Sequence, residues 1–182
     1  MARNRSNLVW IDLETTGLSV GNRAILEIAS IVTDKDLRIV DEGPVLVVHQ
    51  PDDVLERIDP WCEQQHGFSG LLESSRASDV SLGDAERQTL AFVRRHTHRG
   101  VAPLCGSSIL LDRRFLMHYM PDLNAHLSHR NVDVSALHEL AVRWFPGAIA
   151  RLDKGVRHRA ADDIRESIEE LRLYRRLIFK DS

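Results

Sequence analysis

Near its N-terminus the chain reads Leu8-Val9-Trp10-Ile11-Asp12-Leu13-Glu14-Thr15-Thr16-Gly17. The four apolar residues that open this run are typical of a buried strand, and the polar residues that close it are typical of a turn. Because side chains alternate across a strand, Asp12 and Glu14 point to the same face, about 7 Å apart along the backbone. The pair could bind one metal ion, although two acids at a strand end are more often simply solvated.

The bulk properties indicate one soluble domain over residues 1–182. Of the 182 residues, 43% are hydrophobic and 28% are charged, which allows a core without disulfides. The two cysteines, Cys62 and Cys105, lack the spacing of a metal site and favour a reducing compartment. The chain shows no signal peptide and no apolar stretch of about 18 residues, so we expect a cytoplasmic protein that does not enter a membrane.

The charge balance bears on the kind of partner. The net charge of −3, from 24 basic and 27 acidic side chains, argues against a protein that binds a long polyanion through many phosphates. A short nucleic acid held in a pocket remains compatible with this charge, because a local basic patch can coexist with an acidic total.

Further strands are expected after the first. Runs rich in Ile and Val at 25–33 and 37–49 are separated by Asp34-Lys35-Asp36 and predict a hairpin beside the first strand. Short strands are also expected at 102–105 and 131–134. Residues 51–81 are polar and irregular, with a short helical candidate around residues 61–66.

Helices are expected in the second half of the chain. One is capped by Ser81 and ends before Gly100; another contains Asp112 and is stopped by Pro121; a third is capped by Ser135. The last helix shows the clearest pattern, because its apolar residues recur at steps of three and four. These residues are Ile164, Ile168, Leu171, Tyr174 and Ile178. The order of elements predicts a single α/β domain with a mixed sheet.

Two further acids complete a set of four. Asp112 and Asp163 each begin an expected helix, where an acid more often only complements the helix dipole. Together with Asp12 and Glu14 they form an all-oxygen ligand set, which suits Mg²⁺ or Mn²⁺. In two-metal sites such ions lie roughly 3.5–4 Å apart and stabilise both the attacking and the leaving oxygen. We therefore expect two divalent ions in one active site, held by these four carboxylates.

One of the nine histidines stands out by its position. His158 precedes Asp163 by five positions, which is about 140° around a continuous helix, so the two would not share a helix face. We therefore expect His158 just before the helix, where it could overhang the metals and accept a proton from water. A surface or structural role is the usual alternative for a histidine, and the spacing to Asp163 favours the catalytic role.

These motifs resemble those of a known superfamily. The run from Asp12 to Leu18 resembles the first motif of the DEDD exonucleases, and His158-x4-Asp163 with Asp112 resembles the DEDDh branch, whose general base is histidine. The resemblance narrows to the oligoribonucleases over nearly the whole chain, through segments such as Asp112-Arg113-Arg114-Phe115-Leu116. It implies a ribonuclease H-like mixed five-stranded sheet flanked by helices. It also implies a homodimeric 3′→5′ exoribonuclease that degrades short single-stranded RNA, of about two to five nucleotides, to 5′-mononucleotides.

The resemblance also implies substrate contacts. Leu18 would wedge between two bases, and Trp61 would help to enclose them. The terminal 5′ phosphate would be held by His66, Ser108, Arg130 and Ser135. Leucine can offer apolar surface to a base, and arginine can bind phosphate oxygens in a bidentate way. As alternatives, Leu18 and Trp61 could be core residues, and Ser135 could be only a helix cap.

The chain departs from the family pattern at four positions. His129 replaces a tyrosine that reaches the active site of the partner protomer, so its contribution to substrate binding there is smaller or different. An asparagine, a glutamine or similar polar residue, and a methionine are replaced by Ser107, Leu111 and Thr15. These changes keep two alternatives open: a broader DEDDh exonuclease that acts on DNA, and a non-catalytic nucleotide-binding module, against which the complete acid set argues.

Overall fold

The computed structural model describes residues 3–146 and 159–179. His158, the expected general base, lies outside these residues. Within the described ranges, no helix is both long and apolar enough to cross a lipid bilayer.

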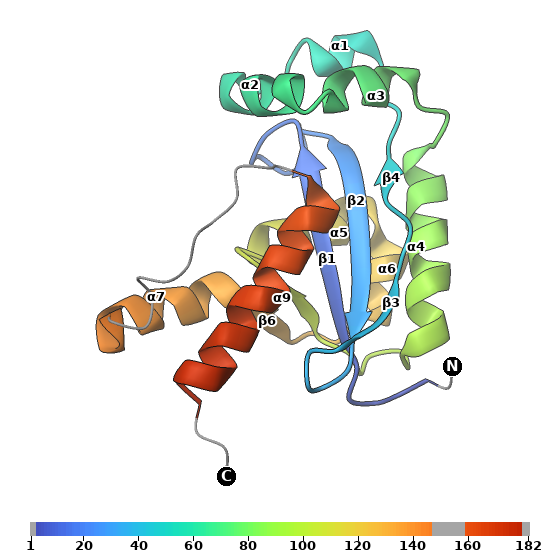
Figure 1. The fold of residues 1–182 in the computed structure, drawn as a ribbon. Coiled ribbons are helices and arrows are strands. Elements are labelled where there is room, and N and C mark those ends of the chain that lie inside the picture. Colours follow the sequence, from blue (N-terminus) through green and yellow to red (C-terminus); the bar gives the residue numbers. More distant parts are fainter. Residues whose placement is uncertain (1–2, 147–158, 180–182) are drawn as a thin grey trace.

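The described residues form one mixed sheet of six strands in the order β3-β2-β1-β5-β6, with β4 also paired to β2 (Figure 1). β1 is antiparallel to β2 and parallel to β5, and β5 is parallel to β6. The strands are β1 (Leu8–Thr15), β2 (Ile25–Thr33), β3 (Ile39–Glu42), β4 (Leu46–Val47), β5 (Leu104–Gly106) and β6 (Asn131–Asp133). The mixed α/β sheet is confirmed, but it has six strands where five were expected. The single strand expected at 37–49 is two short strands instead, because Gly43 and Pro44 interrupt it and proline cannot donate to a sheet ladder.

Alternation along β1 sends its side chains into two separate cores. Val9 and Ile11 pack with α4 (Leu82–His96), α5 (Leu110–Tyr119) and α6 (Pro121–His126) on one face. Trp10 packs on the opposite face with α7 (Val134–Trp144) and α9 (Ala160–Leu177), and α9 crosses the sheet there (Figure 1). By the same alternation, Asp12 and Glu14 point to the α9 face.

Residues 51–81 are mostly helical, so the irregular segment expected there is wrong, whereas the short helix expected around residues 61–66 is confirmed. They form α1 (Asp52–Leu55), α2 (Pro60–Phe68) and α3 (Leu71–Ala77), which lie beyond the end of β1 (Figure 1). Leu26, Leu55 and Leu71 make a small core of their own beneath these helices. Each helix buries few residues and exposes the rest, so the polar composition concealed the helical pattern.

The helix boundaries agree with the sequence in part. Ser81 is the N-cap of α4 and accepts a hydrogen bond from Asp84 N at 3.1 Å, as expected. Pro121 follows the end of α5 and also begins α6, where its missing N–H costs nothing. Ser135 does not cap α7. Asp133 does so, because its Oδ1 accepts a hydrogen bond from Ser135 N at 3.0 Å.

Candidate active site

Three acids meet at the carboxyl end of β1. Asp12 and Glu14 come from β1, and Asp163 comes from the first turn of α9. One carboxylate oxygen from each lies within 4.8 Å of the others. The sheet and α9 therefore bring together three of the four acids that were expected to bind metal.

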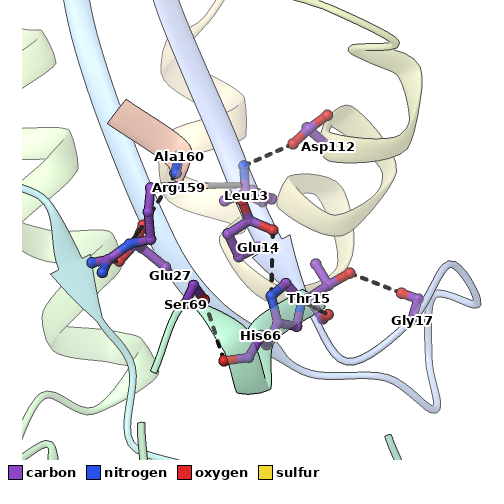
Figure 2. A network of polar contacts seen from close by, with 10 residues as sticks. All are labelled: Leu13, Glu14, Thr15, Gly17, Glu27, His66, Ser69, Asp112, Arg159 and Ala160. Carbon is purple, nitrogen blue, oxygen red and sulfur yellow. Dashed lines mark hydrogen bonds and ion pairs between the residues drawn. The ribbon is translucent and has the colours of Figure 1, made fainter. Parts of the chain in front are cut away.

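The fourth acid, Asp112, approaches from the other side of β1. It lies in the first turn of α5 and is 8% exposed. Its Oδ1 accepts a hydrogen bond from Leu13 N at 2.9 Å, which fixes the carboxylate against the strand (Figure 2). Asp112 also raises the pKa of the Asp12 carboxyl by repulsion, so the two charges are close.

Burial and mutual repulsion make this group of acids unfavourable as four free anions. Burial, and then repulsion from Asp112 and Glu14, raises the pKa of Asp12 well above its usual value. Burial, followed by repulsion from Asp163, raises the pKa of Glu14 to about 7. Burial also raises the pKa values of Asp112 and Asp163 to about 7. A divalent cation would relieve this repulsion, and the all-oxygen donor set fits Mg²⁺ or Mn²⁺.

The turn after β1 is shaped by Thr15, Thr16 and Gly17. Thr15 Oγ1 donates a hydrogen bond to Gly17 O, and Ala24 N donates one to Thr16 Oγ1, each at 2.9 Å. A Cβ atom on Gly17 would overlap the carboxylate of Asp59, so this position requires glycine.

This turn presents Leu18 to solvent near the acids. Leu18 is 65% exposed, and Trp61, on α2, is 60% exposed. The alternative that these two side chains belong to the core is therefore wrong. Both remain available for contacts with bases, as the sequence predicts.

His66 is buried instead of open to solvent. Its side chain is 2% exposed, and Nε2 donates a hydrogen bond to Thr15 O at 3.0 Å. The other ring nitrogen, Nδ1, lies 3.8 Å from Glu14 Oε2 (Figure 2). His66 thus braces α2 against the end of β1, and its contact with a phosphate stays a prediction.

Two of the expected phosphate ligands lie side by side. Ser108 and Ser135 follow the carboxyl ends of β5 and β6, and their hydroxyl oxygens are 3.2 Å apart. Ser108 N donates to Ser135 Oγ at 3.0 Å and to Asp133 Oδ1 at 3.1 Å. These bonds hold Ser108 in the left-handed region, at a φ of 51°.

Arg130 and His129 lie at the opposite end of β6 from Ser135. Both are exposed and both precede β6, whereas Ser135 follows it. Arg130 O accepts a hydrogen bond from Leu104 N at the start of β5, which places it at the amino end of both strands. The backbone of Arg130 thus lies at the amino end of β6 and Ser135 lies beyond its carboxyl end, and the contact of Arg130 with a phosphate stays a prediction.

The chain is similar to several known exonucleases. A family model described as exonuclease matches residues 9–171. The oligoribonuclease of Colwellia psychrerythraea is 50% identical over 180 residues, which are 99% of each chain. The oligoribonuclease of Marinobacter nauticus is 51% identical over 177 residues, which are 97% of this chain and 98% of the relative. That of Pseudomonas aeruginosa is 51% identical over 173 residues, which are 95% of this chain and 96% of the relative. The chain belongs to the oligoribonuclease family.

Solved structures support the fold of this oligoribonuclease-family chain. Exonuclease I from Methylocaldum szegediense matches with a TM-score of 0.75 and 18% identity, over 96% of this chain. The zinc-bound complex of E. coli exonuclease I with single-stranded DNA matches with a TM-score of 0.74 and 14% identity, over 95% of this chain. The chain spans 41% of each of those longer proteins. The ribonuclease H-like exonuclease fold is confirmed.

Two residues beside the site of this oligoribonuclease-family chain were missed from the sequence. Glu27, on β2, is fully buried and bonds to Arg159, the N-cap residue of α9. The sequence signal that could have identified Glu27 is an acid inside the otherwise apolar run Ile25-Leu26-Glu27-Ile28. Acids are almost never fully buried unless they are paired.

Proposed function

We propose that the chain is a 3′→5′ exoribonuclease that hydrolyses very short single-stranded RNA, from dinucleotides to about five nucleotides, to 5′-mononucleotides. The convergence of Asp12, Glu14 and Asp163 at the end of β1 carries this proposal. The family membership supports the kind of substrate.

The four carboxylates would hold two divalent ions, Mg²⁺ or Mn²⁺. Such ions, when bound, supply charge stabilisation for the attacking water and for the departing 3′ oxygen. Asp12, Glu14 and Asp163 offer oxygens toward one point, and Asp112 approaches Asp12 from α5. The bond from Leu13 N leaves one oxygen of Asp112 for a ligand.

His158 is the general base that we propose. An imidazole with a pKa near neutrality can take the proton of the attacking water and release it to solvent. The residue lies outside the described part of the chain. Its role rests on its spacing from Asp163 and on its place directly before Arg159, which begins α9.

The exposed apolar side chains of Leu18 and Trp61 are proposed to contact the bases. Their side chains are 65% and 60% exposed, and apolar or aromatic surface of this kind can pack against a base. The hydroxyls of Ser108 and Ser135, with His66, are proposed to bind the terminal phosphate.

We also propose that the active unit is a homodimer. His129 lies at the opposite end of β6 from Ser135 and takes the place of the tyrosine that reaches the partner's active site in the family, so a second copy of the chain is the source that we propose for this group at the phosphate. Size-exclusion chromatography with light scattering tests this point. We further propose a single domain in the cytoplasm, which the two buried free cysteines support.

The activity is tested with 5′-labelled substrates: an RNA dinucleotide, a seven-nucleotide RNA and a 20-nucleotide DNA. We expect the wild type with Mn²⁺ to cleave the dinucleotide fastest, and we expect chelator, Asp12→Asn or His158→Ala to abolish cleavage. Asp122→Asn, at an exposed acid on α6, serves as the matched control. Equal rates on the long DNA would support the broader exonuclease, and no cleavage of any substrate would support a non-catalytic module.

A further inference from the structure

Glu27 is a carboxylate buried directly beside the candidate metal site. Its side chain is 0% exposed, and its Cα is paired with that of Glu14 across β1 and β2. Its neighbours on β2, Leu26 and Ile28, are also fully buried. A charged group in such a place is strongly unfavourable unless it is paired and hydrogen-bonded.

The hydrogen bonds that Glu27 accepts among the described residues come from the start of α9. Arg159 Nη2 donates to Oε2 at 2.6 Å, and Arg159 Nε donates to Oε1 at 3.2 Å. Ala160 N, at the first position of the helix, also donates to Oε1 at 3.2 Å (Figure 2). The planar fork of arginine matches a carboxylate in this bidentate way, which fixes its orientation as well as its distance.

The same residue connects Glu27 to Asp163. The carbonyl oxygen of Arg159 accepts hydrogen bonds from Asp162 N at 2.9 Å and from Asp163 N at 3.1 Å. Glu27 therefore binds the residues that begin α9, and one of these residues, Arg159, binds the backbone of Asp163. Because the Cα of Glu27 is also paired with that of Glu14 across β1 and β2, Glu27 connects the strand position of Glu14 to the helix start that carries Asp163.

We propose that Glu27 is a positioning residue for the metal site: through Arg159 and Ala160 it fixes Asp163 relative to Glu14, and so sets the affinity for divalent ions. It is proposed as a positioning residue and not as a ligand, since its carboxylate already accepts three hydrogen bonds from Arg159 and Ala160 and it is not part of the cluster of Asp12, Glu14 and Asp163. This inference rests on the proposed metal-dependent function.

A purely electrostatic role of this ion pair predicts the opposite result for one variant. Arg159 carries a positive charge near the acids, close enough to lower the pKa of Glu14. If charge alone mattered, Arg159→Gln would tighten the binding of a cation. If positioning matters, the same change releases the start of α9, and the cation binds more weakly.

The experiment measures Mn²⁺ affinity of the folded, full-length chain by calorimetry and by electron paramagnetic resonance. We expect Arg159→Gln and Glu27→Gln to weaken Mn²⁺ binding by about tenfold or more, the usual effect of removing a group that orients a ligand. Arg159→Lys keeps the charge and loses the fork, so we expect an intermediate loss of several-fold. The control is Arg175→Gln, which removes a different contact of α9, the 2.8 Å bond from Arg175 Nη2 to Asp36 Oδ1, and should leave affinity within about twofold of the wild type.

The outcomes separate the two proposals. Unchanged or tighter Mn²⁺ binding by Arg159→Gln, or wild-type affinity in Arg159→Lys, would overturn the positioning role even if thermal stability falls. If Arg159→Gln does not fold, Arg159→Lys alone decides the question. A wild-type chain that binds no Mn²⁺ would overturn the metal-dependent function itself, and this inference with it.

Discussion

Removing one clustered charge should stabilise the metal-free protein. In the folded chain without metal, burial and repulsion from Asp163 raise the pKa of Glu14 from 4.5 to about 7. Glu14→Gln keeps the size of the side chain and removes the charge. At about 1.4 kcal/mol for each pH unit of the difference, the gain in unfolding free energy is at most about 3 kcal/mol. For a chain of this length that corresponds to several degrees in Tm.

The effect of Glu14→Gln on the unfolding free energy depends on pH. A carboxyl whose folded pKa is raised destabilises the fold only when it is ionised. The penalty is absent below the unfolded pKa of 4.5, grows between 4.5 and about 7, and is complete above that range. Glu14→Gln and the wild type should therefore unfold alike near pH 4, and the variant should be more stable at pH 8.

The assay is thermal unfolding in chelator at both pH values, followed by the same measurement in saturating Mn²⁺. Metal stabilises the wild type by mass action, by about 2.7 kcal/mol at a hundred times its Kd, and the variant should gain less. The advantage of the variant at pH 8 should therefore shrink, because the stabilisation by metal, about 2.7 kcal/mol, is close to the gain of about 3 kcal/mol from removing the charge. Glu63→Gln, at an exposed acid on α2, is the control for the loss of one carboxylate. A Glu14→Gln variant that is less stable than the wild type at pH 8 without metal would refute the reasoning.

Further predictions concern the exposed Trp61, which is proposed to contact a base, and the stability of the fold. Trp61→Ala should raise KM for a dinucleotide about tenfold, since stacking on a base is worth about 1–3 kcal/mol. Its Tm should be nearly unchanged, because the side chain is 60% exposed. An unchanged KM would argue against contact with a base. Ser81→Ala removes the cap of α4 and should lower unfolding free energy by about 1 kcal/mol, with Ser81→Asn restoring it. Phe115→Ala empties a fully buried position and should lower unfolding free energy in urea by about 3–5 kcal/mol; a loss below about 1 kcal/mol would contradict its place in the core.

The parts of the site that follow a local period were predictable from the sequence. The strand period puts Asp12 and Glu14 on one face, and the structure confirms that this face meets α9. The helical period of α9 places its apolar stripe against the sheet, which brings Asp163 to the same end. Both results depend only on alternation and on the 3.6-residue turn, which tertiary contacts do not change.

The parts that depend on long-range pairing were not predictable. Asp133, and not Ser135, caps α7. Aspartate and serine are both common N-cap residues, and the sequence does not show that β6 ends, and α7 begins, directly at Asp133. The bond from His66 to Thr15 O depends on how α2 packs over β1, while the contact of His66 with a phosphate stays a prediction. Glu27 finds its partner 132 positions away in Arg159, a separation that no local pattern reports.

The departures from the family pattern can now be judged by what their side chains touch. Ser107 Oγ lies 2.9 Å from Ser167 Oγ and ties the end of β5 to α9, while Thr15 Oγ1 closes the turn onto Gly17 O. Both hydroxyls are used within the framework of the protein, so neither replacement by itself requires a longer or a deoxy substrate. His129 differs from them, because it is exposed and precedes β6, away from the acids of its own chain. Leu111, the fourth departure, packs against the hydrophobic core of α4, α5 and α6. Any change in substrate preference that these departures cause should therefore come through His129, at the place where we propose that a second copy completes the site.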